Sequence, residues 1–148
     1  MATPSIMKHV ELFRGLSDEQ LKQVALLGKE EVYQVGDILC EQDAPGDKVF
    51  IIMRGQVEIR VRDRRGTQYS AVYLGAGQVI GEMALVDEGK RSATVIAAED
   101  ETTVFAIPSD AFVRLCKTDT HIGYLLMRNI AQDLSFKLRH GNTNPSSD

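Results

Sequence analysis

The sequence has little of what marks a secreted, membrane-bound or disulfide-stabilised protein. It holds only two cysteines, Cys40 and Cys116, which lie far apart and in different predicted elements. Two such cysteines indicate reduced thiols in the cytoplasm rather than a disulfide framework. The chain lacks any apolar run near the roughly 20 residues of a membrane span, and its first residues lack the apolar core of a signal peptide. We therefore expect a cytoplasmic protein with no membrane partner.

Excess positive charge and catalytic groups are also missing. The net charge is −4, from 17 lysines and arginines against 21 aspartates and glutamates, so there is no general attraction to nucleic acid. The three histidines, His9, His121 and His140, lack the spacing of metal ligands. The sequence has no nucleophile–base pair and no triphosphate-binding loop. It thus predicts a protein that is not an enzyme, has no metal site or cofactor, and does not bind nucleic acid.

The length of 148 residues favours one domain. Changes in hydrophobic period divide it into a helical part at 1–28, strands at 29–108, helices at 109–140 and a flexible tail at 141–148. In the first part, Ser17 has the position of a helix cap and Gln20 that of its capping-box partner, after a short helix at 6–13.

The middle of the chain has the pattern of short β-strands. Apolar and β-branched runs alternate with turns that contain glycine, as in an antiparallel barrel or jelly roll. The runs expected to form strands are 31–35, 38–41, 48–54, 56–62, 69–74, 94–98 and 102–107.

Two helices are expected after Pro108, the second over 120–140. The apolar side chains of the second helix recur along one stripe, formed by Leu126, Ile130, Leu134 and Leu138. The stripe fits a seam between two copies of the chain, and it fits equally a face that covers the chain's own barrel.

The segment 81–94, GEMALVDEGKRSAT, carries the strongest functional signal. Gly81 lets the backbone approach a ligand closely, and the short helical turn expected at 83–86 leaves N–H groups available to an anion. Arg91 adds a charged fork that suits phosphate oxygens. Glu82 would repel phosphate, so it is expected to accept a hydrogen bond from a sugar hydroxyl. Taken as isolated residues, Glu82 and Arg91 fit better a salt bridge, or Arg91 a solvated strand position.

This segment resembles the phosphate-binding cassette of the cyclic nucleotide-binding domain family. The cassette has the form Gly-Glu-hydrophobic-Ala-Leu, a short loop, and then Arg-(Ser/Thr/Ala)-Ala-Thr. It is matched here by Gly81, Glu82, Met83, Ala84, Leu85, Arg91, Ser92, Ala93 and Thr94. A second family signature is similar to the stretch from Gly46 to Val57, although Asp43 stands just before it where the family usually has glycine. The resemblance implies a mainly β fold: an eight-stranded antiparallel β-barrel or jelly roll with N-terminal helices and two C-terminal helices.

The resemblance also implies a role for each cassette residue. Arg91 would pair with an equatorial oxygen of a cyclic phosphate, and N–H groups near Ala84 and of Ala93 would complete the anion site. Glu82 would accept from the ribose 2′-OH, beside Gly81. The expected ligand-binding residues are Gly81, Glu82, Met83, Ala84, Arg91, Ser92 and Ala93. The expected purine pocket consists of Ile59, Ala71, Val72 and Ile80 together with Met83, although alternating apolar residues on strands also fit an ordinary core.

The identity of the base rests on few residues. In the family, the hydroxyl residue after the arginine contacts either guanine or phosphate, so Ser92 is compatible with both cGMP and cAMP. Ala71 and Val72 are apolar where some cGMP-selective members carry arginine, which favours cAMP.

We therefore predict a cAMP-binding regulatory sensor that signals through a conformational change of its last helix. It would form a homodimer through that helix and act on a protein partner that the sequence does not identify. A cGMP sensor and an interaction module that has lost its ligand are the alternatives. Members resembling the catabolite activator protein continue into a helix-turn-helix domain, and kinase regulatory subunits carry two such binding domains. Because this chain stops at Asp148, we expect a stand-alone module or a fragment of a larger protein.

Overall fold

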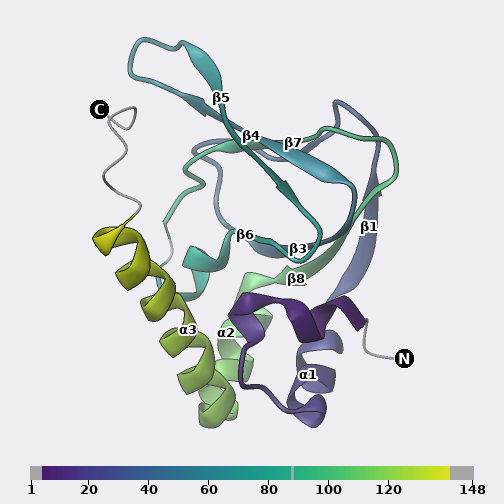
Figure 1. Cartoon of the computed structure of the whole chain (residues 1–148), viewed down its shortest axis with the longest axis vertical. Coiled ribbons are helices and arrows are strands. Elements are labelled where there is room, and N and C mark those ends of the chain that lie inside the picture. Colours follow the sequence, from purple (N-terminus) through teal and green to yellow (C-terminus); the bar gives the residue numbers. More distant parts are fainter. Residues whose placement is uncertain (1–4, 88, 141–148) are drawn as a thin grey trace.

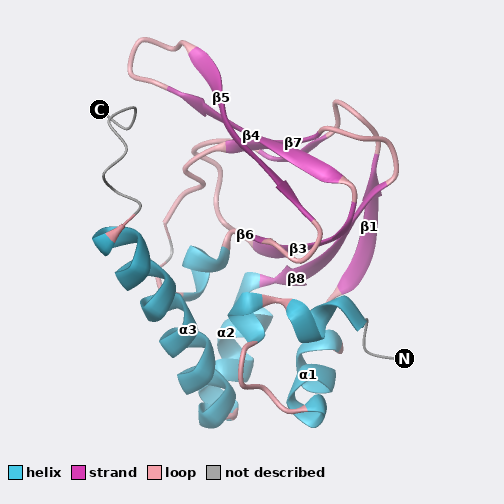
Figure 2. Cartoon of the chain, viewed as in Figure 1, coloured by secondary structure: helices cyan, strands magenta, loops and turns pink. Residues whose placement is uncertain are grey.

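Two β-sheets and a layer of helices form the structure, a computed structural model that describes residues 5–87 and 89–140 (Figures 1 and 2). The N-terminal helical elements are η1 (Ser5–His9), η2 (Glu11–Phe13) and α1 (Asp18–Ala25). The strands are β1 (Lys29–Tyr33), β2 (Ile38–Cys40), β3 (Lys48–Arg54), β4 (Gln56–Arg62), β5 (Gln68–Gly75), β6 (Val79–Ile80), β7 (Thr94–Ala97) and β8 (Thr102–Pro108). The remaining helical elements are η3 (Glu82–Leu85), α2 (Ser109–Thr118) and α3 (Thr120–Arg139). The α-helices gather on one side of the two sheets (Figure 1).

The strands form two four-stranded antiparallel sheets, with the orders β1-β8-β3-β6 and β2-β7-β4-β5. The eight strands that the family resemblance implies are confirmed, although the sequence pattern located only seven of them. Of the predicted barrel or jelly roll, the barrel is not closed, because no pairing joins the two sheets within the described residues. Two of the four edge strands are very short, with three residues in β2 and two in β6. The β4–β5 hairpin extends beyond the other strands (Figure 1). These edges offer too few facing backbone groups to complete a barrel ladder.

Strand β3 is buried on both faces, which explains its uninterrupted apolar run. Val49 and Ile51 pack with the apolar side chains of the helices. Phe50 and Ile52 point to the opposite face and pack with Val57 of the second sheet. Since successive side chains of a strand alternate between faces, a strand between two layers needs apolar residues at every position. The molecule thus has a helix–sheet core and a sheet–sheet core on either side of β3.

The N-terminal part consists of short turns and one helix. The helix expected at 6–13 is not continuous, because Val10 has an extended backbone that separates η1 from η2. The predicted cap of α1 is confirmed. The Ser17 hydroxyl accepts from the Gln20 N–H at 3.2 Å, and the Gln20 side chain accepts from the Ser17 N–H at 2.8 Å.

The two predicted C-terminal helices are confirmed. Asp119 has an extended backbone between α2 and α3, and its side chain accepts from the N–H of Ile122 at 3.2 Å. Helix α3 is packed against the body as far as Ile130, whereas residues 131–140 are exposed. None of the helices in the described part of the chain is long and apolar enough to cross a bilayer. The tail predicted to be flexible, 141–148, lies outside the described residues.

Candidate functional site

Segment 81–94 joins β6 to β7 through a tight turn, η3 and a loop. Gly81 precedes η3 with φ 85° and ψ 16°, a left-handed conformation that glycine adopts without a Cβ clash. The turn η3 begins one residue earlier than expected, and buried Leu85 fixes it to the core. The Ala84 N–H donates to the Gly81 carbonyl at 3.1 Å. Gly81 therefore sets the direction in which η3 leaves the sheet.

Arg91 stands out in this segment because it is charged and only 7 % exposed. Its N–H donates to the Ala44 carbonyl and its carbonyl accepts from the Asp43 N–H, both at 2.8 Å. One Nη donates to the Lys48 carbonyl, and Cζ lies 5.7 Å from the centroid of the Phe50 ring. The Nε has no hydrogen-bond partner within the described part of the chain. Within the described part of the chain, the cation thus contacts neutral groups, and its buried Nε makes no hydrogen bond.

Gly81 and Gly46 leave the space that the Arg91 side chain occupies. A Cβ at Gly81 would collide with Nη1 of Arg91 and would lie 3.1 Å from the Lys48 carbonyl oxygen. A Cβ at Gly46 would lie 3.9 Å from Cζ of Arg91 and 3.5 Å from Cβ of Ala84. The glycines of both family signatures therefore border the guanidinium.

Glu82 is half-buried and lines the same cavity as Arg91, but does not pair with it in the described part of the chain. Burial raises the pKa of the Glu82 carboxyl. Its own N–H and Lys137 of α3 act to lower the pKa, and Asp133 of α3 acts to raise it. The salt bridge between Glu82 and Arg91 that the sequence also allowed is absent from the ion pairs of the described residues. A carboxylate and a guanidinium are thus both available to a ligand.

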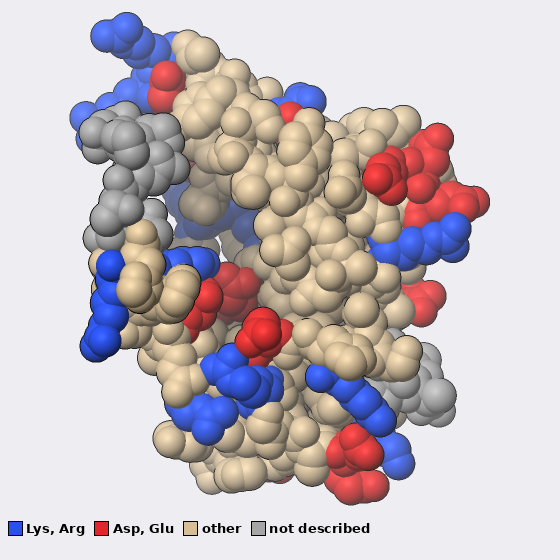
Figure 3. All heavy atoms as spheres, viewed as in Figure 1, with Lys and Arg blue, Asp and Glu red and all other residues tan. Residues whose placement is uncertain are grey.

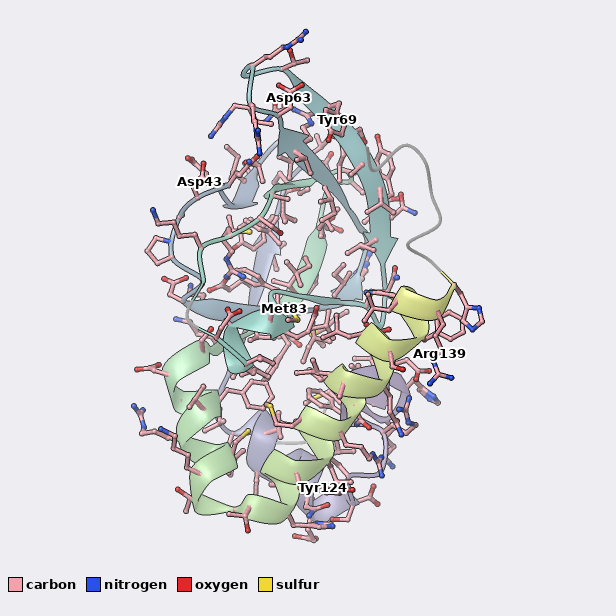
Figure 4. All side chains as sticks on the ribbon, turned by 90° about the vertical axis from the view of Figure 1, so that its left-hand side faces the viewer. Asp43, Asp63, Tyr69, Met83, Tyr124 and Arg139 are labelled. Carbon is pink, nitrogen blue, oxygen red and sulfur yellow. The ribbon has the colours of Figure 1, made fainter. Side chains whose placement is uncertain are left out.

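A cavity of about 260 Å³ lies at this segment. Its lining consists of Cys40, Gly46, Ile59, Leu74, Val79, Ile80, Gly81, Glu82, Met83, Ala84, Asp87, Gly89, Lys90, Arg91, Ser92, Ala93 and Val95. Figure 3 shows a hollow beside α3, with both acidic and basic side chains at its walls. In Figure 4, Met83 on η3 lies where the strands meet the helices, and Asp63 and Tyr69 lie far from it at the end of the β4–β5 hairpin. The volume is near the lower end of small-molecule sites, about 300–1,000 Å³.

The structure brings most of the predicted site residues together. All seven predicted ligand-binding residues line the cavity, and so do Ile59 and Ile80 of the predicted purine pocket. Ala71 and Val72 do not line it and are exposed on β5. They lie where the register of β5 shifts opposite Ile59 and Arg60, and the extra residue of such a bulge redirects side chains. Their contact with a purine stays a prediction.

Several residues of the site were not predicted, for a physical reason. Lys48 contributes its backbone carbonyl, and a backbone group has no signal in residue type. Phe50 belongs to an apolar run that predicts a buried strand, so its contact with Arg91 was hidden. Cys40 and Lys90 also line the cavity, and only the position of Lys90 next to Arg91 offered a signal.

The site is arranged for binding. Arg91 offers a donor and a buried positive charge, while Glu82 offers acceptors close by. No group of three histidine, cysteine, aspartate or glutamate side chains in ranges 5–87 and 89–140 is placed to hold a metal ion. The chemistry present is the recognition of a small anion that also carries hydroxyl groups.

Comparisons with known proteins agree with this chemistry. The sequence pattern of the family described as "Cyclic nucleotide-binding domain" matches residues 30–119. The chain is 29% identical to the cyclic AMP receptor protein of Thermus thermophilus over 136 residues, which cover 92% of this chain and 61% of that protein. It is also 29% identical to cGMP-dependent protein kinase, isozyme 1, of Drosophila melanogaster, over 75% of this chain and 15% of the kinase. The chain thus spans only part of the length of these relatives.

Solved structures share the fold. The N-terminal domain of a transcriptional regulator from Streptomyces coelicolor A3(2) superposes with a TM-score of 0.80 at 24% identity, covering 92% of this chain and 96% of that one. The catabolite activator protein of Thermus thermophilus gives a TM-score of 0.76 at 28% identity, covering 90% and 60%. The family match covers more than half of the sequence and contains the whole segment 81–94. The chain therefore belongs to the cyclic nucleotide-binding domain family, a family of regulatory ligand-binding domains.

Proposed function

We propose that this chain is a sensor that binds a cyclic nucleotide, preferably cAMP, in the cavity at 81–94. The observation that carries the proposal is the buried, unpaired Nε of Arg91. A buried guanidinium without an anionic partner is costly, and a cyclic phosphate in the cavity would supply both the charge and the acceptor.

Each part of the ligand has a group that suits it. The phosphate pairs with Arg91 and with the N–H of Ala93, and the ribose 2′-OH donates to the Glu82 carboxylate. The purine packs against Ile59 and Ile80, which line the cavity with Met83. The preference for cAMP rests on the apolar Ala71 and Val72. The relatives of the chain do not decide between the two nucleotides, since they include both a cyclic AMP receptor protein and a cGMP-dependent protein kinase.

Calorimetric titration with cAMP, cGMP and 2′-deoxy-cAMP tests the proposal. We expect cAMP to bind most tightly, and 2′-deoxy-cAMP about 10- to 100-fold more weakly, because Glu82 would lose its donor. Arg91→Ala should weaken binding strongly, whereas Arg64→Ala, an exposed control on the β4–β5 turn, should not. Absence of binding at high micromolar concentrations would favour the alternative, an interaction module that has lost its ligand. Tighter binding of cGMP would reverse the assignment of the base.

The output of the sensor is proposed to be a movement of the second half of α3. Residues 131–140 are exposed rather than packed, and Lys137 and Asp133 in this half act electrostatically on Glu82 in the cavity. A ligand that contacts Glu82 therefore changes the electrostatic environment of α3. It shifts the helix to the extent that it binds one arrangement better than the other.

We also propose that this half of α3 forms a homodimer. The stripe expected on the helix divides in two: Leu126 and Ile130 are buried in the chain's own core, whereas Leu134 is 39 % and Leu138 is 69 % exposed. Exposed leucines at this spacing suit a coiled-coil seam. Sedimentation equilibrium should give a dimer for the parent and a monomer for the double variant Leu134→Gln, Leu138→Gln. A Ser135→Gln control should stay dimeric, and a parent that is monomeric would contradict the proposal.

A further inference from the structure

Among residues 5–87 and 89–140, the groups that contact the guanidinium of Arg91 are neutral. Its Nη donates to a carbonyl, that of Lys48, and the Phe50 ring lies beneath Cζ at 5.7 Å from the centroid. This distance is within the roughly 6 Å over which an aromatic face attracts a cation. A carboxylate in the same place would neutralise the charge and compete with an anionic ligand. A ring and a carbonyl orient the guanidinium without neutralising its positive charge.

The two groups that hold Arg91 are themselves fixed. Lys48 and Phe50 both belong to β3, two residues apart, so the carbonyl and the ring are carried by one strand. Phe50 is 2 % exposed and pairs with Ala106 of β8 on one side and Ile80 of β6 on the other. Because its strand is hydrogen-bonded along both edges, the Phe50 ring has little freedom to move.

The Lys48 side chain adds a second restraint. Its Nζ lies 3.1 Å from Oε2 of Glu31 on β1, and Tyr33 donates to the other oxygen of that carboxylate at 2.6 Å. This pair holds the first residue of β3, whose carbonyl accepts from Arg91. The guanidinium is therefore prepositioned before any ligand arrives.

We propose that Phe50 is a positioning residue of the anion site: its ring holds the Arg91 guanidinium in the orientation in which it meets a phosphate. The identity of the anion as a cyclic nucleotide rests on the proposed function, whereas the orientation of Arg91 does not. Phe50 itself touches no ligand and acts only through Arg91.

The first test observes Arg91 directly in the ligand-free protein. The Nε–H of Arg91 should give a resolved proton–nitrogen NMR signal, assigned by its loss in Arg91→Lys and shifted upfield by the ring below. Phe50→Leu should move that signal downfield and broaden it. Phe50→Tyr, which keeps the ring, and Phe105→Leu, an equally buried phenylalanine in the other core cluster, should leave it in place. An unchanged signal in Phe50→Leu would overturn the proposal. If Phe50→Leu does not fold, Phe50→Met takes its place, since methionine adapts to irregular core space.

The second test measures binding of cAMP. Phe50→Leu should weaken binding about five- to tenfold, while Phe50→Tyr and Phe105→Leu stay near the parent. In the Arg91→Lys background, Phe50→Leu should not weaken binding of cAMP any further, because lysine lacks the planar fork that the ring orients. Full additivity would show that Phe50 acts only on stability and would overturn the proposal. If the parent binds no cyclic nucleotide, the proposed function fails, and the NMR signal still decides the role of Phe50.

Discussion

Gly81 and Arg91 depend on each other, because the guanidinium fills the space that any side chain at Gly81 would need. Glycine at this position therefore serves two purposes. It adopts a positive φ, and it makes room for the buried charge.

Gly81→Ala should weaken binding of cAMP at least about tenfold, because the new Cβ displaces Arg91. Gly66→Ala is the matched control, since Gly66 has φ +84° against +85° at Gly81, but a Cβ at Gly66 would have no atom within 4 Å. Both variants carry a similar backbone strain of about 1–2 kcal/mol, which thermal unfolding measures. Calorimetric titration should find a loss of affinity in Gly81→Ala alone. An equal loss in both variants would contradict the role of Gly81 in making room for Arg91.

Affinity for cAMP, measured by calorimetry, should fall as the pH is lowered from neutral through the raised pKa of Glu82. Burial raises the pKa of Glu82 from its ordinary value of 4.5, so the carboxyl takes up its proton at a higher pH than usual and loses the charge that strengthens a hydrogen bond from ribose. Glu82→Gln should bind more weakly and lose this pH dependence. Glu19→Gln, an exposed control on α1, should keep it.

The raised pKa of Glu82 also affects the stability of the ligand-free protein. Stability depends on pH in the opposite direction to affinity, because low pH favours it. Since the folded chain binds the Glu82 proton more tightly than the unfolded chain, this group contributes stability at low pH that is lost as the pH rises through the raised pKa. Glu82→Gln should therefore raise the unfolding temperature at neutral pH without ligand. A variant less stable than the parent would show that the Glu82 carboxylate is well solvated in the folded state.

At the scale of elements, long and strongly patterned segments were predictable. The run 48–54 predicted β3, and Ser17 with Gln20 predicted the start of α1. The two-residue strand β6 was not predicted, because two residues are too short to have a period. The open edges between the sheets were missed for a different reason. Closure depends on which strands pair across long separations, and alternation within one strand carries no information about that.

Asn129 should contribute strongly to the attachment of α3. It is buried, its Nδ2 donates to the carbonyls of Leu12 at 2.8 Å and Arg14 at 2.9 Å, and its Oδ1 accepts from Arg128 at 3.0 Å. Asn129→Ala should lower the free energy of unfolding by about 2–4 kcal/mol, because it leaves the buried Leu12 carbonyl without its donor and the Arg14 carbonyl with only the longer bond from Arg128 at 3.4 Å. Ser135→Ala on the exposed half of the helix should change it by less than about 0.5 kcal/mol. Urea unfolding measures both, and equal values would mean that α3 is held by its apolar contacts alone.

For the whole molecule, the sequence predicted the site residues that belong to segment 81–94. It did not predict the groups that only the tertiary structure brings to the site. The spacing from Gly81 to Arg91 predicted seven residues that line one cavity. Phe50 and the Lys48 carbonyl come from a strand that is distant in sequence, and only tertiary structure brings them to Arg91. A contiguous motif can therefore identify a binding site without revealing what holds its charged group in place.

Bound ligand should stabilise the whole fold and should also cover the side chains that line the cavity. The two cysteines allow these two effects to be measured separately. Bound ligand raises the free energy of unfolding by about 2.7 kcal/mol at one hundred times Kd, which slows any alkylation that requires unfolding. Cys40 lines the cavity, whereas Cys116 lies on α2 outside its lining. Both thiols are half-buried, and burial raises the pKa of each.

Under native conditions, saturating cAMP should therefore slow alkylation of Cys40 much more than that of Cys116, as followed by mass spectrometry with N-ethylmaleimide. Equal protection of the two thiols would mean that the ligand acts only through global stability or binds elsewhere.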